Sequence, residues 1–336
     1  MFCSHDNKSD KKYTCLTLSD LIDVIEIFNK EHLNDPIDYK RVLQKSISDD
    51  NKTERLWNLL NKRHFSTCGN DEFCWFSCAM NQSDPKIKKI IKDRYRPVGP
   101  PGHEWLSNFD IMDVMDQFER KDPSFKFFGP YPRDFQDIVT NSKFNITTLF
   151  KQYGVNKFGF VFNQSKHKEP GSHWVSAFID LSTPDSTIEY FDSGAQHPKH
   201  EIDEWFHIMK DKIQTDLGKK VTIKKNKIQH QFKDSECGVY SMNFIVNRLG
   251  GQTFEEFTSN IIKDDQTNKL RFKEKKGFFT PPPTCALRTR KGQMIGGQIH
   301  PINPFDSIIK VPLKKRIGGK ICPCRYLTQG FLPKYE

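Results

Sequence analysis

Apolar positions in the first hundred residues recur with the period of an α-helix. The clearest case lies over residues 16–28, where a broad apolar face follows Thr17 or Ser19, two residue types that cap helices. The same pattern predicts helices over three stretches: residues 16–28, 52–63 and 87–95. A proline- and glycine-rich run over residues 97–102 then breaks the chain. We therefore predict a helical N-terminal arm domain over residues 1–97.

After this break the helical period gives way to short apolar runs bounded by turn residues. Such runs predict four strands, over residues 158–162, 174–179, 187–191 and 221–225. Helices are expected from residue 107 to 119, from 132 onward, and over 198–217 and 237–249. The last of these is apolar on most of its faces, as in a buried helix. The sequence thus predicts an α+β core domain over residues 98–279, with a mixed β-sheet flanked by helices.

Residues 280–336 form a third segment, a basic C-terminal tail that contains many glycines and prolines. The tail carries +8 of the chain's net charge of +10 at neutral pH. Lysine and arginine clusters bind phosphates, so contact with a polyanion such as nucleic acid is weighed against a merely solvated tail. The tail also repeats the form Ile-Gly-Gly-x-Ile, at residues 295–299 and 317–321. These segments are either self-processing or substrate-mimicking sites, or flexible turns.

The bulk composition narrows the class of protein. With 36% hydrophobic and 28% charged residues over 336 positions, the chain can bury a sizeable core. No apolar run approaches 18 residues and no signal-peptide pattern opens the chain, so neither a membrane span nor secretion is expected. The nine cysteines are irregularly spaced, and free thiols are expected rather than a disulfide framework. Two groups of cysteines are weighed as zinc ligands: Cys68, Cys74 and Cys78, and the pair Cys322 and Cys324. Neither group has a spacing typical of zinc sites, so no metal or cofactor is predicted.

One cysteine stands where the predicted buried helix begins. Cys237 opens that helix, and Gln231 lies six residues before it. Earlier in the chain, His173 precedes one predicted strand and Asp192 follows the next. A cysteine attacks a carbonyl as its thiolate, which a helix N-terminus stabilises. His173 could hold the thiol proton and deliver it to a leaving amine, and Asp192 is the residue type that fixes the imidazole tautomer.

Three further groups fit the same chemistry. The Gln231 side-chain amide and the Cys237 backbone N–H could donate to the oxyanion of an acyl-transfer intermediate. Gly238 would leave room for substrate, and Trp174 is expected to pack on the histidine or to shape a substrate groove. Taken singly, a buried cysteine or a histidine before a strand is more often structural than catalytic. The chain order of the whole set instead predicts a cysteine protease that works through an acyl-enzyme.

These motifs resemble those of the ubiquitin-like-protein-specific protease superfamily, which includes the adenovirus protease, and in particular its viral polyprotein-processing members. The likeness rests on the His-Trp pair at 173–174, the segment Glu-Tyr-Phe-Asp-Ser at 189–193 and the Gln-x5-Cys-Gly pattern at 231–238. It implies a catalytic cysteine at the N-terminus of a central helix and hydrolysis after Gly-Gly-x motifs. Asp192 favours a conventional Cys-His-Asp triad, because some viral members are expected to carry asparagine at this position.

The resemblance implies a cysteine endopeptidase of a large DNA virus that cleaves structural polyproteins during virion maturation. Such an enzyme is expected in the host cytoplasm, at virus assembly sites, and in the virion. An isopeptidase that removes ubiquitin or a ubiquitin-like modifier from host proteins would use the same catalytic set and the same diglycine preference. A third interpretation, an inactive scaffold or nucleic-acid-binding protein with the protease fold, is disfavoured by the complete set of four residues.

Overall fold

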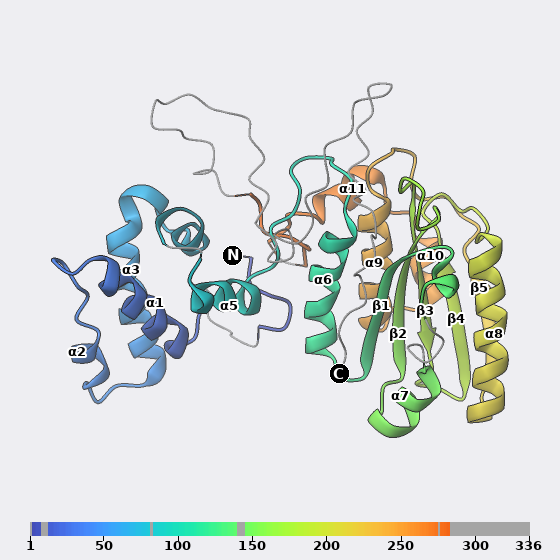
Figure 1. Cartoon of the computed structure of the whole chain (residues 1–336), viewed down its shortest axis with the longest axis horizontal. Helices are drawn as coiled ribbons and strands as arrows, with labels where there is room; N and C mark the ends of the chain where they lie inside the picture. Colours follow the sequence, from blue (N-terminus) through green and yellow to red (C-terminus); the bar gives the residue numbers. More distant parts are fainter. Residues whose placement is uncertain (1, 8–12, 81–82, 140–144, 275, 283–336) are drawn as a thin grey trace. The chain divides into compact units, whose positions relative to one another are not determined.

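The chain folds into two compact units (Figure 1). The computed structural model describes residues 2–7, 13–80, 83–139, 145–274 and 276–282. One unit comprises the described residues up to Gly99 together with 279–282, and the other runs from Pro100 to Phe278. The domain boundaries that the sequence suggests, after residues 97 and 279, stay predictions.

The basic tail lies outside the described residues beyond residue 282. Its two Ile-Gly-Gly segments, Cys322 and Cys324 lie there too, so the interpretations attached to them are not tested by the structure. In the part of the chain that is described, no helix is both long and apolar enough to cross a bilayer.

The N-terminal unit is helical. Its helices are α1 (Leu18–Glu31), α2 (Lys40–Leu43), α3 (Asp49–Cys68), α4 (Glu72–Cys74) and α5 (Pro85–Arg94), with a π-helical turn over Trp75–Ala79. α1 begins at a capping box in which Thr17 and Asp20 exchange hydrogen bonds, so the cap predicted at residue 17 or 19 is Thr17. The apolar faces of α1, α3 and α5 close a core around Trp75 and Phe76.

A single buried carboxylate ties three parts of this unit together. Glu72 accepts hydrogen bonds from Thr14 Oγ1, the Cys15 amide, Trp57 Nε1 and Tyr95 Oη at 2.7–2.8 Å. Burial raises the pKa of Glu72, and these four hydrogen bonds act in the opposite direction. The segment before α1, helix α3 and the residue after α5 are therefore held on one acceptor.

Two disulfides in the N-terminal unit correct the expectation of free thiols. Cys3 pairs with Cys15 and Cys68 with Cys74, at Cα–Cα distances of 5.3 and 5.5 Å that suit a disulfide. The second pair joins the end of α3 to the end of α4, where a short turn reverses the chain. Spacing along the sequence did not reveal either pair, because their approach depends on how the helices pack. Cys237 is a free thiol.

The second unit is built on a five-stranded mixed sheet, which confirms the predicted α+β fold. In spatial order the strands are β1 (Phe125–Pro132), β2 (Lys157–Asn163), β3 (Trp174–Asp180), β4 (Asp185–Phe191) and β5 (Lys220–Lys225). The pairs β1–β2 and β4–β5 are parallel, whereas β2–β3 and β3–β4 are antiparallel. Strands β2 to β5 are the four that the apolar pattern predicted.

Helices cover both faces of this sheet (Figure 1). They are α6 (Asn108–Lys121), α7 (Ile146–Tyr153), α8 (His200–Leu217), α9 (Cys237–Leu249), α10 (Phe254–Ser259) and α11 (Asp264–Lys269). On one face, Trp205 of α8 packs edge-on against Phe160 of β2, with ring centroids 4.8 Å apart. On the other, Phe244 of α9 stacks on Phe191 of β4 at 5.2 Å. α9 is thus the buried central helix that the sequence predicted.

The first strand and the residues after it depart from the prediction. The helix expected from residue 132 onward does not form, because Pro132 ends β1 and only a 3₁₀ turn over Phe135–Asp137 follows. Glycine and proline are unfavourable inside a strand, so the sequence Phe-Lys-Phe-Phe-Gly-Pro-Tyr-Pro did not indicate one. β1 tolerates them because it is an edge strand whose register shifts between Phe128 and Tyr131.

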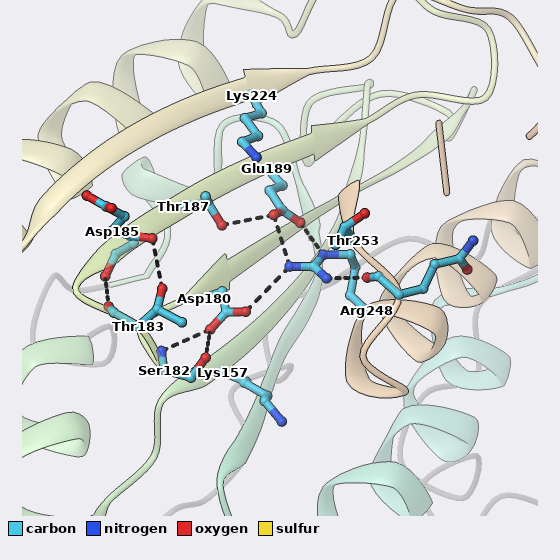
Figure 2. A network of polar contacts seen from close by, with 12 residues as sticks. Lys157, Asp180, Ser182, Thr183, Asp185, Thr187, Glu189, Lys224, Arg248 and Thr253 are labelled. Carbon is cyan, nitrogen blue, oxygen red and sulfur yellow. Dashed lines mark hydrogen bonds and ion pairs between the residues drawn. The ribbon is translucent and has the colours of Figure 1, made fainter. Parts of the chain in front are cut away.

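A buried polar network holds the C-terminal end of α9 on the sheet (Figure 2). Arg248 Nε lies 2.5 Å from Glu189 Oε2, and Arg248 Nη2 lies 3.4 Å from Asp180 Oδ2. Thr187 Oγ1 donates to Glu189 Oε1 at 2.9 Å. The Arg248 and Glu189 side chains are 9% and 1% exposed, and removing one partner of such a pair typically costs about 3–5 kcal/mol. The network therefore fixes the helix whose first residue is Cys237.

Candidate active site

The strand order brings the predicted histidine and acid to one edge of the sheet. His173 directly precedes β3 and Asp192 directly follows β4, and the two strands are antiparallel with Ser176 opposite Phe191. The start of β3 and the end of β4 therefore lie side by side. Strands β2 and β5 also end at this edge, since β2 is antiparallel to β3 and β5 is parallel to β4.

His173 and Asp192 make the central contact of the site. His173 Nε2 lies 2.7 Å from Asp192 Oδ1, and Asp192 is fully buried. Oδ1 also accepts from the Gly194 amide at 2.7 Å, and Oδ2 accepts from Gln164 Nε2 at 3.1 Å. The Asn226 side chain bonds the amide and the carbonyl of Asp192, at 2.9 and 2.8 Å. The carboxylate is thus held in one orientation before any substrate arrives.

Sequence reasoning missed Gln164 and Asn226. Gln164 directly follows β2 and Asn226 directly follows β5, so each is a polar side chain at the end of a predicted strand. That signal was present in the sequence. Using it required the strand order, which places the ends of β2, β4 and β5 at the same edge.

Cys237, the first residue of α9, contacts His173. It is 2% exposed, and its interaction with the imidazole contributes to the raised pKa of His173. Because Nε2 faces Asp192, Nδ1 is the ring nitrogen left for the thiol. Burial alone would lower the pKa of His173, but the hydrogen bonds and charges of Asp192 and Cys237 outweigh burial and raise it to about 10. The imidazole is therefore protonated at neutral pH, as a thiolate–imidazolium pair requires.

The first turn of α9 adds backbone donors beside the thiol. Its N-cap residue, Glu236, makes no side-chain cap hydrogen bond. The Glu236 carboxylate instead accepts from the amide and hydroxyl of Ser235 and pairs with His103 Nδ1 at 3.1 Å. The first amides of a helix have no intrahelical partner, and the N-terminus is the positive end of the helix dipole. This helix end therefore suits negative charge on the sulfur or on a carbonyl oxygen beside it.

Gln231 lies next to the acid rather than within the Asp192–His173–Cys237 contacts. Its Oε1 accepts from Ser193 Oγ at 2.6 Å and its Nε2 donates to the Lys233 carbonyl at 2.6 Å. The amides of His230 and Gln231 both donate to the Ser193 carbonyl, at 2.8 and 2.9 Å. The segment that carries Gln231 is therefore attached to the residue after Asp192. A carboxamide has two N–H donors, so one remains for another acceptor.

The two predicted substrate-binding residues, Trp174 and Gly238, contact the segment before α6. Trp174 is 6% exposed and donates from Nε1 to the Leu106 carbonyl at 2.9 Å. A Cβ at position 238 would lie 3.1 Å from Leu106 Cβ and 3.2 Å from Trp174 Cδ1. The absence of a side chain there lets Leu106 and Trp174 approach the first turn of α9. Contact of either residue with substrate stays a prediction.

Replacing Gly238 by alanine is expected to destabilise the fold by about 1 kcal/mol. Overpacking against Leu106 and Trp174 typically costs about 1–3 kcal/mol, which exceeds the helix propensity gained with alanine. Urea denaturation measures the change. Gly250→Ala, at the other end of α9, is the matched control, because its Cβ would meet only backbone oxygens at 3.4 and 3.5 Å. Equal stability of the two variants would contradict the packing role of Gly238.

The contacts among these residues support nucleophilic acyl transfer. Asp192 hydrogen-bonds to His173, His173 interacts with Cys237, and the uncapped end of α9 lies at the sulfur. Within the described ranges there is no cluster of three or more His, Cys, Asp or Glu side chains that could hold a metal ion. The side chains that meet at the site are a thiol, an imidazole and a carboxylate, the groups used in nucleophilic catalysis by cysteine.

The chain is similar to a protease family model and to named viral proteases. The family described as the Ulp1 protease family, C-terminal catalytic domain, matches residues 162–277, a span that contains His173, Asp192, Gln231 and Cys237. A protein of Acanthamoeba polyphaga mimivirus that carries the name thiol protease is 29% identical over 294 residues, covering 84% of this chain and 97% of that protein. A cysteine protease of African swine fever virus, isolate Tick/Malawi/Lil 20-1/1983, is 29% identical over 202 residues, or 55% and 73% of the two chains.

The fold is similar to that of a solved protease. The crystal structure of the African swine fever virus protease superposes with a TM-score of 0.57 at 20% identity, covering 84% of this chain and 96% of that chain. A relative from another isolate of the same virus, Pig/Kenya/KEN-50/1950, is 28% identical over 202 residues and carries the name SUMO-1 cysteine protease.

Proposed function

Because this chain is a cysteine protease of the Ulp1 family, as its motifs indicated, we propose that it is a viral endopeptidase that processes structural polyproteins. The observation that carries the proposal is the chain of contacts from Asp192 through His173 to Cys237. A viral source is supported by the viral relatives, one of which the chain matches over 97% of its length. The enzyme would cleave after Gly-Gly-x motifs during virion maturation, at assembly sites in the host cytoplasm and in the virion.

In the acylation half-reaction, the Cys237 thiolate attacks the scissile carbonyl carbon. The C=O electron pair moves onto oxygen, and the backbone N–H of Cys237 donates to the oxyanion, with the Gln231 amide as the proposed second donor. His173, protonated at neutral pH, gives its proton to the leaving amine as the C–N bond breaks. The products of this half are a thioester on Cys237 and the free amine of the downstream peptide.

In the deacylation half-reaction, water replaces the amine. His173, now neutral, removes a proton from the water that attacks the thioester. Collapse of the second tetrahedral intermediate releases the carboxylic acid and restores the thiolate–imidazolium pair. Asp192 holds the imidazole by Nε2 throughout, so that Nδ1 stays directed at the sulfur and the reacting atoms.

The rival function is an isopeptidase that removes ubiquitin or a ubiquitin-like modifier, and the name of one swine fever virus relative favours it. Paired assays separate the two functions. The enzyme is given a diglycine-x peptide that spans a cleavable bond and, separately, a modifier–fluorophore conjugate. The proposed function predicts cleavage of the peptide, with Cys237→Ala as the blank. Cleavage of the conjugate alone would establish the isopeptidase instead.

An inactive scaffold is the remaining alternative, and a covalent reagent tests it. A diglycine peptide that ends in a thiol-reactive group should label Cys237 in the folded enzyme. Labelling that is no faster than that of the same cysteine after denaturation would favour the scaffold over both enzymes.

The pH dependence of hydrolysis should have an alkaline limb near pH 10. The pKa of His173 is raised from its ordinary 6.5 to about 10, so the imidazolium that protonates the leaving amine is lost as the pH passes that value. The same shift stabilises the fold fully below pH 6.5, and that contribution is also lost as the pH rises through about 10. The test measures kcat/KM for a peptide against pH, with circular dichroism to check folding at each point.

The pH dependence of Cys237 alkylation is the control for that of hydrolysis, because alkylation needs the thiolate but no proton donor. Its rate should therefore show no decline at the pH where hydrolysis declines. A parallel decline of both rates in folded protein would contradict the role of His173 as the acid.

A further inference from the structure

Two buried side chains of opposite charge hold Ser235, which lies two residues before Cys237. Arg271 Nη2 donates to the Ser235 carbonyl at 3.0 Å. The Glu236 carboxylate accepts from the Ser235 amide at 3.1 Å and from its hydroxyl at 2.8 Å. Arg271 and Glu236 are both 0% exposed. Every polar group of Ser235 is thus bound by a charged partner.

Burying the charges of Glu236 and Arg271 costs desolvation free energy, and their positions affect the charge of the thiol. A buried carboxylate next to a nucleophilic thiol opposes negative charge on the sulfur. The positive charge of Arg271 counters this effect, and two of its donors, Nε and Nη1, have no hydrogen-bond partner among the described residues. A buried arginine with a merely structural role usually has its donors satisfied.

The surroundings of the pair show which charges act on it. Burial lowers the pKa of Arg271, while the charges of Glu236, Asp110, Cys237 and Glu104 act in the opposite direction. Glu236 also pairs with His103, and the charge of Lys233 interacts with it. The buried guanidinium of Arg271 therefore interacts electrostatically with both Cys237 and Glu236.

We propose that Arg271 and Glu236 are positioning residues for the nucleophile. Their hydrogen bonds to Ser235 fix the backbone that leads into α9, and with it the Cys237 amide. The positive charge of Arg271 offsets that of Glu236, so that negative charge on the Cys237 sulfur is not opposed. The inference rests on the proposed role of Cys237 as the nucleophile.

The test is the pH dependence of Cys237 alkylation, followed by mass spectrometry of the peptide that contains it. Iodoacetamide reacts with the thiolate, so the rate rises with pH to a plateau with a measurable midpoint. Arg271→Met should move the midpoint up by about one pH unit and slow alkylation about tenfold at lower pH. Glu236→Gln should move it down. The double variant should return the midpoint close to that of the wild type.

Arg271→Lys separates charge from geometry. Lysine keeps the positive charge but lacks the planar guanidinium fork. The midpoint should therefore stay near the wild-type value, while kcat for peptide hydrolysis falls about tenfold or more with KM unchanged, because the Cys237 amide is no longer fixed. If Arg271→Met fails to fold, Arg271→Lys still tests the effect of charge. A shifted midpoint of Cys237 alkylation in folded Arg271→Lys would show that the positive charge of residue 271 does not set the midpoint.

The matched control is an arginine at the other end of α9, Arg248, which forms an ion pair with Glu189 (Figure 2). Arg248 lies eleven residues from Cys237, about 16 Å along the helix. Arg248→Met should lower stability without moving the midpoint. Equal shifts for Arg248→Met and Arg271→Met, or no reversal in the double variant, would overturn the inference. Loss of selective Cys237 labelling in the wild type would instead overturn the proposed function itself.

Discussion

Replacing Cys237 by alanine is expected to lower kcat for peptide hydrolysis by about 10⁵–10⁶-fold, the usual loss when the nucleophile of a catalytic triad is removed. Without the sulfur no thioester forms, and His173 and Asp192 have no covalent intermediate to act on. Cleavage of a diglycine-x peptide, with enzyme concentration fixed by active-site titration of the wild type, measures the loss. The variant should still bind the peptide, because the helix backbone around position 237 is unchanged.

The same variant has a second readout that does not depend on any substrate. The pKa of His173 is raised to about 10 by Asp192 and Cys237 against the effect of burial, so removing the thiol should lower it. Histidine-selective NMR titration measures this change. Ser241→Ala, one turn along α9 and 1% exposed, is the matched control and should leave both kcat and the His173 titration unchanged. Hydrolysis within tenfold of the wild type in Cys237→Ala would place the nucleophile elsewhere.

Strand ends explain how much of the site the sequence could predict. His173 and Asp192 were found because each borders an apolar run, and alternating chain direction brings a strand start beside the end of the next antiparallel strand. Cys237 was found because the apolar helix begins at that residue. Gln164 and Asn226, which hydrogen-bond to Asp192, could not be predicted in the same way. Predicting them requires the order of the strands in the sheet, which local sequence patterns do not contain.

Burial was the other limit on prediction. Arg271 belongs to a charged run, Leu-Arg-Phe-Lys-Glu-Lys-Lys, which resembles a solvated surface, yet the residue is 0% exposed. The chain after α11 directs the Arg271 side chain inward, where it donates to the Ser235 carbonyl. The disulfide partners Cys3 and Cys15 were hidden for the same reason, since tertiary packing rather than spacing brings them together.

An arginine is bound near each end of the central helix, and the contacts of the two arginines differ in a way that matters for function. Arg248 makes direct ion pairs with Glu189 and Asp180 and anchors the helix to the sheet. Arg271 instead donates to the carbonyl of Ser235, two residues before Cys237, and keeps donors without partners among the described residues. The first arrangement favours stability, and the second is consistent with tuning of the thiol.

Replacing Asp192 by asparagine is expected to lower kcat by about 10²–10⁴-fold while the protein stays folded. Asparagine keeps the shape of the side chain, so Oδ1 can still accept from the Gly194 amide, but the charge that supports the imidazolium is lost. At the other end of the side chain, an amide would meet Gln164 Nε2, which is also a donor. His173 would thus be less firmly oriented and less basic. The alkaline limb of kcat/KM should move below pH 10 accordingly.

A second aspartate–histidine pair in the same unit supplies the control. Asp134 is 5% exposed, and its Oδ2 lies 2.7 Å from His167 Nδ1, as close as Asp192 lies to His173. Asp134→Asn removes the same charge from the same kind of contact outside the site. It should cost stability without moving the alkaline limb or lowering kcat more than about twofold, within the range of small indirect effects. If both variants changed the pH profile alike, the carboxylate of Asp192 would be acting through the stability of the fold and not through its contact with His173.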